Sequence, residues 1–186
     1  MTKILAVANQ KGGVGKTTTT INLAASLAAT KQRVLLIDLD PQGNATMGSG
    51  IEKRNLPATV YHVLLGSSSL RDACCRSETG KYDVLPANRE LAGAEIELVD
   101  LPQRETRLKD ALEPVAEDYD YILIDCPPAL NLLTLNGLCA ARSVMIPMQC
   151  EYYALEGLSD LVNTIQKVRA NLNPHLEIEG LLRTMF

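Results

Sequence analysis

Residues 9–20 of the chain, NQKGGVGKTTTT, carry the most structural information in the sequence. They follow a short apolar segment, residues 3–8, and lead into a segment with a helical apolar face that begins at residue 16. Glycines between a strand and a helix let the backbone approach a phosphate group, and the helix N-terminus behind them favours an anion. The combination G-K-T-T in this context is specific, so it predicts a phosphate-binding loop rather than a glycine-rich turn that binds nothing.

This loop offers backbone and side-chain groups suited to a nucleotide. Its N–H groups form an anion cradle, and Lys16 supplies positive charge to the β- and γ-phosphates. The hydroxyl of Thr17 is placed to bind Mg²⁺. The usual pattern G-x-x-x-x-G-K-[ST] is not met in full, because Gln10 stands at the first glycine position and Lys11 precedes the glycine pair. The expected nucleotide-binding residues are Gly12, Gly13, Val14, Gly15, Lys16, Thr17 and Thr18.

An acidic segment follows the next apolar run. Residues 33–39 form a predicted strand that runs into D-L-D at residues 38–40, and P-Q-G then breaks the strand and starts a loop. Carboxylates at the C-terminal end of a parallel strand lie at the crevice where α/β sheets bind ligands. Asp38 and Asp40 would share a side of the sheet if the strand persists. The P-Q-G segment could also be only a turn, although the flanking carboxylates favour a functional loop.

A third motif is Y-I-L-I-D at residues 121–125. An apolar strand that ends in aspartate is a Walker B pattern, in which the carboxylate holds a Mg²⁺-bound water. Alone, Asp125 could equally be a helix cap or a turn residue. It is the third element of a phosphate site in the correct order, which favours the metal. Cys126 is expected to be a small buried residue beside the site rather than a nucleophile, because no histidine lies nearby in the sequence.

The remaining pattern predicts the fold class. Strand-length apolar runs alternate with helical stretches, which implies right-handed crossovers and a doubly wound α/β sheet, mostly parallel, with helices on both faces. The predicted strands are residues 3–8, 33–39, 82–86, 120–125, 143–149 and 176–184. The predicted helices are residues 16–30, 58–65, 69–75, 89–98, 104–117, 130–141 and 154–171. We expect a surface excursion at 66–80, a buried strand at 176–184, and one domain over residues 1–186.

Composition restricts the class of protein. Apolar residues make up 46% and charged residues 22%, as in ordinary globular chains. The net charge of −4 argues against a globally basic nucleic-acid-binding surface but not against a local basic patch. No run of about 18 apolar residues and no signal-peptide pattern occurs. The five cysteines include no C-x-x-C motif, so we expect reduced thiols and a cytoplasmic protein.

Several segments resemble one known family. Residues 11–18, KGGVGKTT, resemble the deviant Walker A motif of the ParA/MinD ATPases, and residues 38–46, DLDPQGNAT, resemble the switch I segment of ParA proteins. Residues 90–98 and 146–158 resemble segments of the ParA/Soj chromosome-partition proteins. The resemblance implies a P-loop ATPase that binds ATP and Mg²⁺ and forms a homodimer on ATP. It also implies non-specific DNA binding at the nucleoid, a stimulating ParB-type partner, and no membrane partner.

The resemblance also implies roles for individual residues. The implied catalytic residues are Lys11, Lys16 and Asp40, and the implied magnesium ligands are Thr17, Asp38 and Asp125. Lys11 would reach the nucleotide of the partner subunit, although a plain solvated loop charge is the alternative. Asp40 would position or activate the attacking water. Asp38 would help to hold the metal through water.

The family further implies a longer chain. Its members usually continue for roughly one more strand and some helices that include adenine contacts and basic DNA-binding residues, so a C-terminally truncated domain is expected. Glu151 is a candidate interface or ribose contact, or equally a plain loop carboxylate. The remaining candidates for DNA contact, each of which could also be a solvated surface charge, are Arg142, Lys167, Arg169 and Arg183.

Three alternatives stay open. A MinD-type membrane-positioning ATPase would use a C-terminal basic amphipathic helix, and the sequence contains no such segment. An iron–sulfur carrier of the same P-loop subgroup would bind its cluster through cysteines from two subunits, with Cys126 and Cys139 as candidates. A non-catalytic fragment that binds nucleotide poorly is the third alternative.

Overall fold

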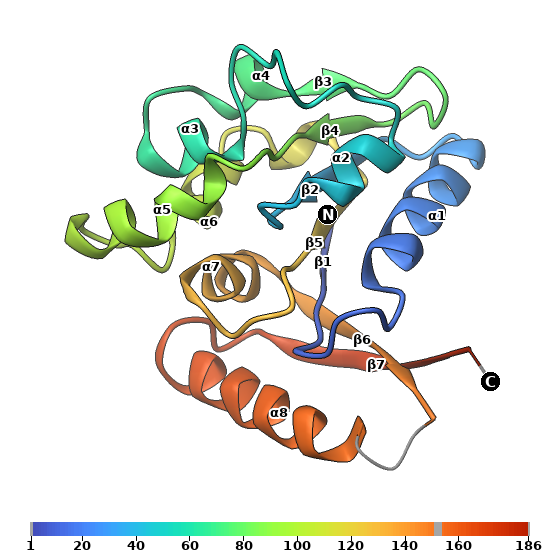
Figure 1. Cartoon of the computed structure of the whole chain (residues 1–186), viewed down its shortest axis with the longest axis vertical. Helices are drawn as coiled ribbons and strands as arrows, with labels where there is room; N and C mark the ends of the chain where they lie inside the picture. Colours follow the sequence, from blue (N-terminus) through green and yellow to red (C-terminus); the bar gives the residue numbers. More distant parts are fainter. Residues whose placement is uncertain (1, 151–153, 186) are drawn as a thin grey trace.

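A computed structural model of the chain describes residues 2–150 and 154–185. Its centre is a seven-stranded sheet in the order β3-β4-β2-β5-β1-β6-β7 (Figure 1). Neighbouring strands are parallel except for β3 and β4. β1 lies between β5 and β6, so the chain builds one half of the sheet first and then returns to build the other. The carboxyl ends of strands beside such a reversal are where α/β sheets bind ligands.

The elements have the following bounds. The strands are β1 (Lys3–Val7), β2 (Val34–Asp38), β3 (Cys75–Arg76), β4 (Asp83–Leu85), β5 (Tyr121–Asp125), β6 (Ser143–Gln149) and β7 (Glu177–Thr184). The α-helices are α1 (Lys16–Ala29), α2 (Asn44–Gly48), α3 (Val60–Leu65), α4 (Leu70–Ala73), α5 (Leu91–Glu97), α6 (Arg107–Leu112), α7 (Leu132–Ala140) and α8 (Ala154–Asn171). Two short 3₁₀ helices cover Leu98–Asp100 and Ala116–Asp118.

Helices cover both faces of the sheet. α1 and α2 pack on one face, against Leu5, Leu36 and Leu123 of the central strands. The helices from α3 to α8 pack on the other face, against Ile37 and Ile124, and Figure 1 shows α1 on one side of the strands with α7 and α8 on the other. Successive residues of a strand point to opposite faces, so a strand covered on both faces is apolar throughout. The predicted doubly wound α/β fold is confirmed.

Residues 66–80, the predicted surface excursion, include an edge strand of the sheet. They contain α4 and β3, and β3 pairs antiparallel with β4 at the edge of the sheet. Leu70 and Ser77 are buried, and the Ser77 hydroxyl donates to the carbonyl oxygen of Ser49 at 2.8 Å. The segment is otherwise mostly exposed, as predicted, and the short edge strand within it was not predicted. A two-residue strand contains too little alternation to be recognised from the sequence.

Two predicted elements are shorter than expected. α6 ends at Leu112 rather than continuing through residue 117, because Pro114 has no N–H group to donate to the preceding turn. β2 ends at Asp38, and the residues after it turn away. The condition under which Asp38 and Asp40 would share a side of the sheet, a strand that persists to residue 40, is therefore not met.

The burial of β7 also differs from the prediction. β7 pairs with β6 and is the last strand of the sheet on that side. Its side chains are largely exposed, and Ile178 and Leu181 are 45% and 53% exposed. The prediction of a buried strand at residues 176–184 is wrong for the described part of the chain, because its apolar residues have no covering layer there.

α8 presents the apolar stripe expected from its spacing. Leu161, Ile165 and Val168 are buried against the core, while the side chain of Leu155 lies outside the described residues. Among the described residues, no helix is both long enough and apolar enough to cross a membrane.

Candidate functional site

The glycine-rich loop connects β1 to α1. Gly13 and Gly15 have φ angles of 71° and 87°, in the left-handed region that favours glycine. A Cβ atom added at Gly12 or Gly13 would meet nothing within 4 Å, so this part of the loop is open to a ligand. α1 begins at Lys16, directly after Gly15, and its first N–H groups have no partner within the helix. The loop therefore offers backbone donors at a helix N-terminus, which is an anion-binding arrangement.

Lys16 reaches back across this loop. Its Nζ donates to the carbonyl oxygen of Lys11 at 2.9 Å, and the residue is only 7% exposed. Burial lowers the pKa of Lys16, and the negative charges of Asp125 and Asp40 oppose this effect. Lys11 itself is half-buried, with its backbone N–H donating to Asn9 Oδ1 at 3.0 Å. The predicted loop lysines are thus in contact through the Lys11 backbone.

Two threonines of α1 hold Asp125 at the end of β5. Thr17 Oγ1 donates to Asp125 Oδ2 at 2.7 Å, and Thr20 Oγ1 lies 3.2 Å from Oδ1. The two threonines are one turn apart on the same face of the helix. The structure therefore brings the predicted residues Thr17 and Asp125 into direct contact. Thr20 was not predicted, although its spacing of three from Thr17 within the T-T-T-T run was a usable signal.

Two buried carboxylates end adjacent strands. Asp38 and Asp125 are paired in register on β2 and β5, and they are 0% and 1% exposed. Burial raises the pKa of Asp38 to about 6. Burial, together with the charge of Asp38, raises the pKa of Asp125 to about 7. The hydrogen bonds from Thr17 and Thr20 lower this pKa and only partly offset the increase. A nearby divalent cation would favour the charged carboxylates, and hard oxygen ligands of this kind suit Mg²⁺.

Asp40 belongs to a tight turn after β2. Its backbone N–H donates to Asp38 Oδ1 at 3.1 Å, and its Oδ1 accepts from the N–H of Gln42 at 2.9 Å. Its carbonyl oxygen accepts from the N–H of Gly43 at 2.8 Å. Gly43 has a φ of 63°, and a Cβ atom there would lie 2.7 Å from the carbonyl oxygen of Ala87. The turn is therefore fixed between the end of β2 and the segment after β4.

Thr46 is a further contributor that the sequence did not reveal. Its Oγ1 and N–H both donate to Asp38 Oδ2, at 2.7 and 2.8 Å, and its Oγ1 accepts from the N–H of Ala87 at 2.9 Å. Both oxygens of Asp38 therefore have partners in the segment that contains Asp40. Asp38 organises this segment, and Thr17 and Thr20 contact Asp125 instead.

Thr184, the last residue of β7, contacts the glycine-rich loop from the other side. Its Oγ1 donates to the carbonyl oxygen of Val14 at 2.9 Å, and it also lies 3.3 Å from the Met148 carbonyl oxygen. The C=O of Val14 and the N–H of Gly15 belong to one trans peptide unit, so they point in opposite directions. Holding the carbonyl toward β7 therefore aims the Gly15 N–H away from β7. Val14 and Thr184 are 170 positions apart, so no local pattern in the sequence could predict this contact.

Thr18 and Cys126 directly follow Thr17 and Asp125 in the chain. Thr18 is exposed on the first turn of α1. Cys126 is buried, and burial raises the pKa of its thiol far above the usual range, so its prediction as a small buried residue is confirmed. Glu151 lies outside the described residues. The candidate DNA contacts, all exposed, are Arg142 after α7, Lys167 and Arg169 on α8, and Arg183 on β7.

We expect Asp125→Asn to flatten the dependence of stability on pH. Asp125 holds its proton to higher pH in the folded chain than when unfolded, so its stabilising contribution is complete below its unfolded pKa and is lost as pH rises through about 7. From pH 6 to pH 8 the unchanged chain should lose about 1 kcal/mol more stability than the variant. Urea unfolding in EDTA measures this difference. If stability falls equally with pH in the two proteins, the raised pKa of Asp125 is contradicted.

Comparison with known proteins gives consistent matches over the chain. The AAA domain family matches residues 2–178. The sporulation initiation inhibitor protein Soj of Bacillus subtilis is 58% identical over 185 residues, covering 100% of this chain and 73% of Soj. The chromosome partitioning protein ParA of Caulobacter vibrioides is 53% identical, covering 99% of this chain and 70% of ParA.

A solved structure extends the match to three dimensions. A Mycobacterium smegmatis crystal structure, described as cobyrinic acid a,c-diamide synthase with bound ATP analog and magnesium, has a TM-score of 0.97 to this chain. The two chains are 46% identical, and the match covers 100% of this chain and 76% of the other.

Proposed function

The chain belongs to the ParA/Soj family of chromosome partitioning proteins, and on that premise we propose that it is an ATPase of DNA partition. In this proposal residues 1–186 are one ATPase domain that binds ATP and Mg²⁺ and forms a homodimer on ATP. The dimer binds DNA without sequence preference, which associates it with the nucleoid. A ParB-type partner stimulates hydrolysis of ATP to ADP and phosphate, and the nucleotide state thereby controls attachment to DNA.

The contact between Thr17 and Asp125 is the observation that carries this proposal. It joins the end of the glycine-rich loop to the end of β5 at 2.7 Å, beside the buried Lys16. A glycine-rich loop, a lysine, a hydroxyl and a strand-end carboxylate are the parts that P-loop proteins use on a nucleotide triphosphate. The relative of known structure that contains an ATP analog and magnesium supports ATP and Mg²⁺ as the cofactors.

Specific residues are proposed to hold these cofactors. The N–H groups of residues 12–18 and the Lys16 ammonium group bind the phosphates. Thr17 and Asp125 hold Mg²⁺, and Asp38 contributes through water. When bound, Mg²⁺ neutralises charge on the phosphates during transfer. The buried carboxylates with raised pKa values fit a cation, because a cation relieves the cost of keeping them charged.

The catalytic set is proposed to be Lys11, Lys16 and Asp40. Asp40 is half-buried in the turn after β2, where its carboxylate would orient or deprotonate a water. Lys16 stabilises charge that develops on the phosphoryl oxygens. Lys11 lies near the start of the same loop and contributes its charge to the nucleotide of a second subunit, in the manner of an arginine finger.

We expect Thr184→Val to weaken binding of an ATP analog about fivefold, because the Val14 carbonyl loses its donor and the Gly15 N–H is no longer held toward the phosphates. A fivefold change is about 1 kcal/mol, as for one ordinary hydrogen bond. Calorimetry with a non-hydrolysable analog measures the effect.

Thr184→Ser is the matched control, because it keeps the hydroxyl and removes only the methyl group. The Thr184 methyl carbon lies 3.6 Å from the place that a Gly15 Cβ would occupy. Valine keeps this methyl group, so if serine weakens binding and valine does not, the methyl contact rather than the hydrogen bond positions the loop.

The proposed function is tested by ATP hydrolysis with and without duplex DNA of random sequence and the ParB-type protein of the same genome. We expect a slow basal rate that rises when both are present. A rate no higher than that of Lys16→Ala under any condition would overturn the ATPase. A rate of hydrolysis that changes with neither DNA nor the ParB-type protein would support an ATPase and contradict its proposed role in partition.

A second function comes from the description of the Mycobacterium smegmatis structure. An amide synthase would couple ATP consumption to a carboxylic acid and a nitrogen donor. Hydrolysis that requires cobyrinic acid and glutamine, and ignores DNA, would favour that function. The iron–sulfur alternative receives no support from its candidate ligands, because Cys126 and Cys139 are 1% and 2% exposed and a cluster shared by two subunits needs thiols at the surface.

A further inference from the structure

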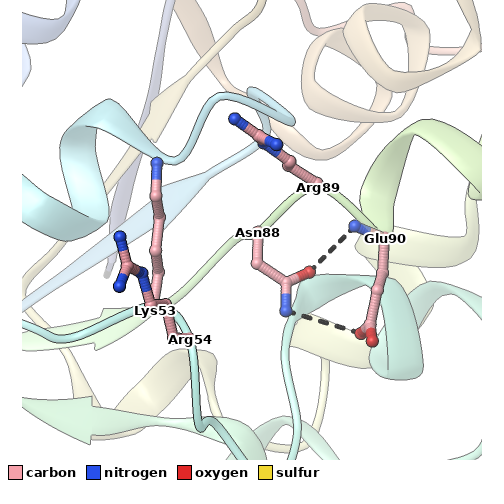
Figure 2. Close-up of a pocket in the computed structure, with 5 residues that line it drawn as sticks. All are labelled: Lys53, Arg54, Asn88, Arg89 and Glu90. Atoms are coloured by element: carbon pink, nitrogen blue, oxygen red, sulfur yellow. Dashed lines mark hydrogen bonds between the residues drawn. The ribbon is translucent and has the colours of Figure 1, made fainter.

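A pocket of about 330 Å³ lies next to the turn that contains Asp40. Figure 2 shows Lys53 and Arg54 on one segment and Asn88, Arg89 and Glu90 on the facing segment. The first segment follows α2, and the second connects β4 to α5. The pocket is thus built from two loops at the end of the sheet where β2 and β4 finish.

Three cations, Lys53, Arg54 and Arg89, line the pocket. Four arginines elsewhere pair with carboxylates, in Arg33–Asp120, Arg71–Asp118, Arg76–Asp83 and Arg104–Glu105. Within the described ranges, the guanidinium groups of Arg54 and Arg89 make no hydrogen bond or ion pair. The only carboxylate that lines the pocket, Glu90, lies 3.4 Å from Asn88 Nδ2. In a chain with a net charge of −4, such a cluster of cations favours an external anion.

Both walls of the pocket connect to carboxylates of the proposed nucleotide site. Lys53 Nζ donates to the carbonyl oxygen of Gln42 at 2.5 Å, and the Gln42 N–H donates to Asp40. On the other wall, the residue before Asn88 donates its N–H to Thr46, which in turn donates to Asp38. An anion that draws Lys53 away from Gln42 would release one restraint on the Asp40 turn. Binding in the pocket and the state of this turn are then linked in both directions.

We propose that this pocket binds a backbone phosphate of duplex DNA. The inference rests on the proposed function, which supplies DNA as a partner, and adds where and how the chain contacts it. No aromatic side chain is among the five lining residues, so the pocket offers charge to a phosphodiester but no stacking surface to a base. Binding of this kind ignores sequence and weakens as salt rises.

The test compares two double variants with the same change in charge. Arg54→Gln with Arg89→Gln removes the unpaired guanidinium groups, and Lys167→Gln with Arg169→Gln removes two exposed cations of α8. Fluorescence anisotropy of a labelled duplex, with an ATP analog present, gives affinity as a function of KCl. We expect the pocket variant to bind about tenfold more weakly in about 0.1 M KCl and to lose about 1 to 2 from the slope of log K against log [KCl]. The α8 variant should keep both values, and basal hydrolysis without DNA should be unchanged in the two variants.

The outcomes separate the pocket from the proposed function. If the unchanged chain binds DNA and the pocket variant binds equally well, or the α8 variant loses as much, the pocket assignment is overturned and the partition ATPase stands. If the pocket variant loses affinity for the ATP analog and keeps affinity for DNA, the pocket takes nucleotide phosphates and the assignment is again overturned. If the unchanged chain binds no DNA, both proposals fail.

Discussion

Lys16→Ala should abolish ATP hydrolysis and weaken binding of an ATP analog about 100-fold or more. Lys16 is 7% exposed, and its ammonium group lies among the loop backbone, Asp125 and Asp40. Removing one partner of a buried, charge-assisted contact typically costs about 3 kcal/mol, which corresponds to that change in affinity. Calorimetry with the analog and a phosphate-release assay with ATP measure the two effects separately.

Lys109→Ala is the matched control, because it removes an exposed lysine of α6 from a surface remote from the loop. It should leave binding and hydrolysis unchanged. Urea unfolding shows whether Lys16→Ala remains folded. A folded Lys16→Ala protein that binds the analog as tightly as the unchanged chain would contradict the phosphate-contact role.

The parts of this site that could be predicted are those that local spacing specifies. The loop, the start of α1 and the strand-end carboxylates follow from residues adjacent in sequence, because a strand, a glycine turn and a helix leave little choice of geometry. Thr17 and Asp125 are far apart in the chain, yet each occupies a fixed place in its motif. The topology of a parallel sheet then brings the strand ends together.

The residues that sequence could not supply act through contacts that only the folded chain creates. Thr46 reaches Asp38 because the turn at Gly43 reverses the chain, and Thr184 reaches Val14 because β7 pairs beside β6. The burial of β7 was misjudged for the same reason. The sequence shows which side chains of a strand are apolar, whereas their exposure depends on which other elements pack against the strand.

Asp40→Ala should reduce the rate of hydrolysis at least about 100-fold and leave affinity for the ATP analog within about threefold. A positioned general base contributes on the order of 10² to 10⁴ to a rate and little to ground-state binding, so the loss should appear in kcat rather than in KM. ATP-dependent dimerisation, followed by light scattering, should persist. Loss of dimerisation together with hydrolysis would place Asp40 in the subunit contact instead.

Asp40→Asn separates chemistry from the shape of the turn. The asparagine oxygen can still accept from the Gln42 N–H, which lies 2.9 Å from Asp40 Oδ1, so the turn is kept while the basic carboxylate is lost. If Asp40 acts on the water, Asn and Ala lower kcat alike. If Asn restores the rate and Ala does not, Asp40 is a positioning residue whose hydrogen bond holds the turn, and the water must be activated elsewhere. The same two variants, assayed with DNA present, test whether the turn couples DNA binding at Lys53 to hydrolysis. Alanine no longer holds the turn, so the residual rate of hydrolysis of Asp40→Ala should not change when DNA is added.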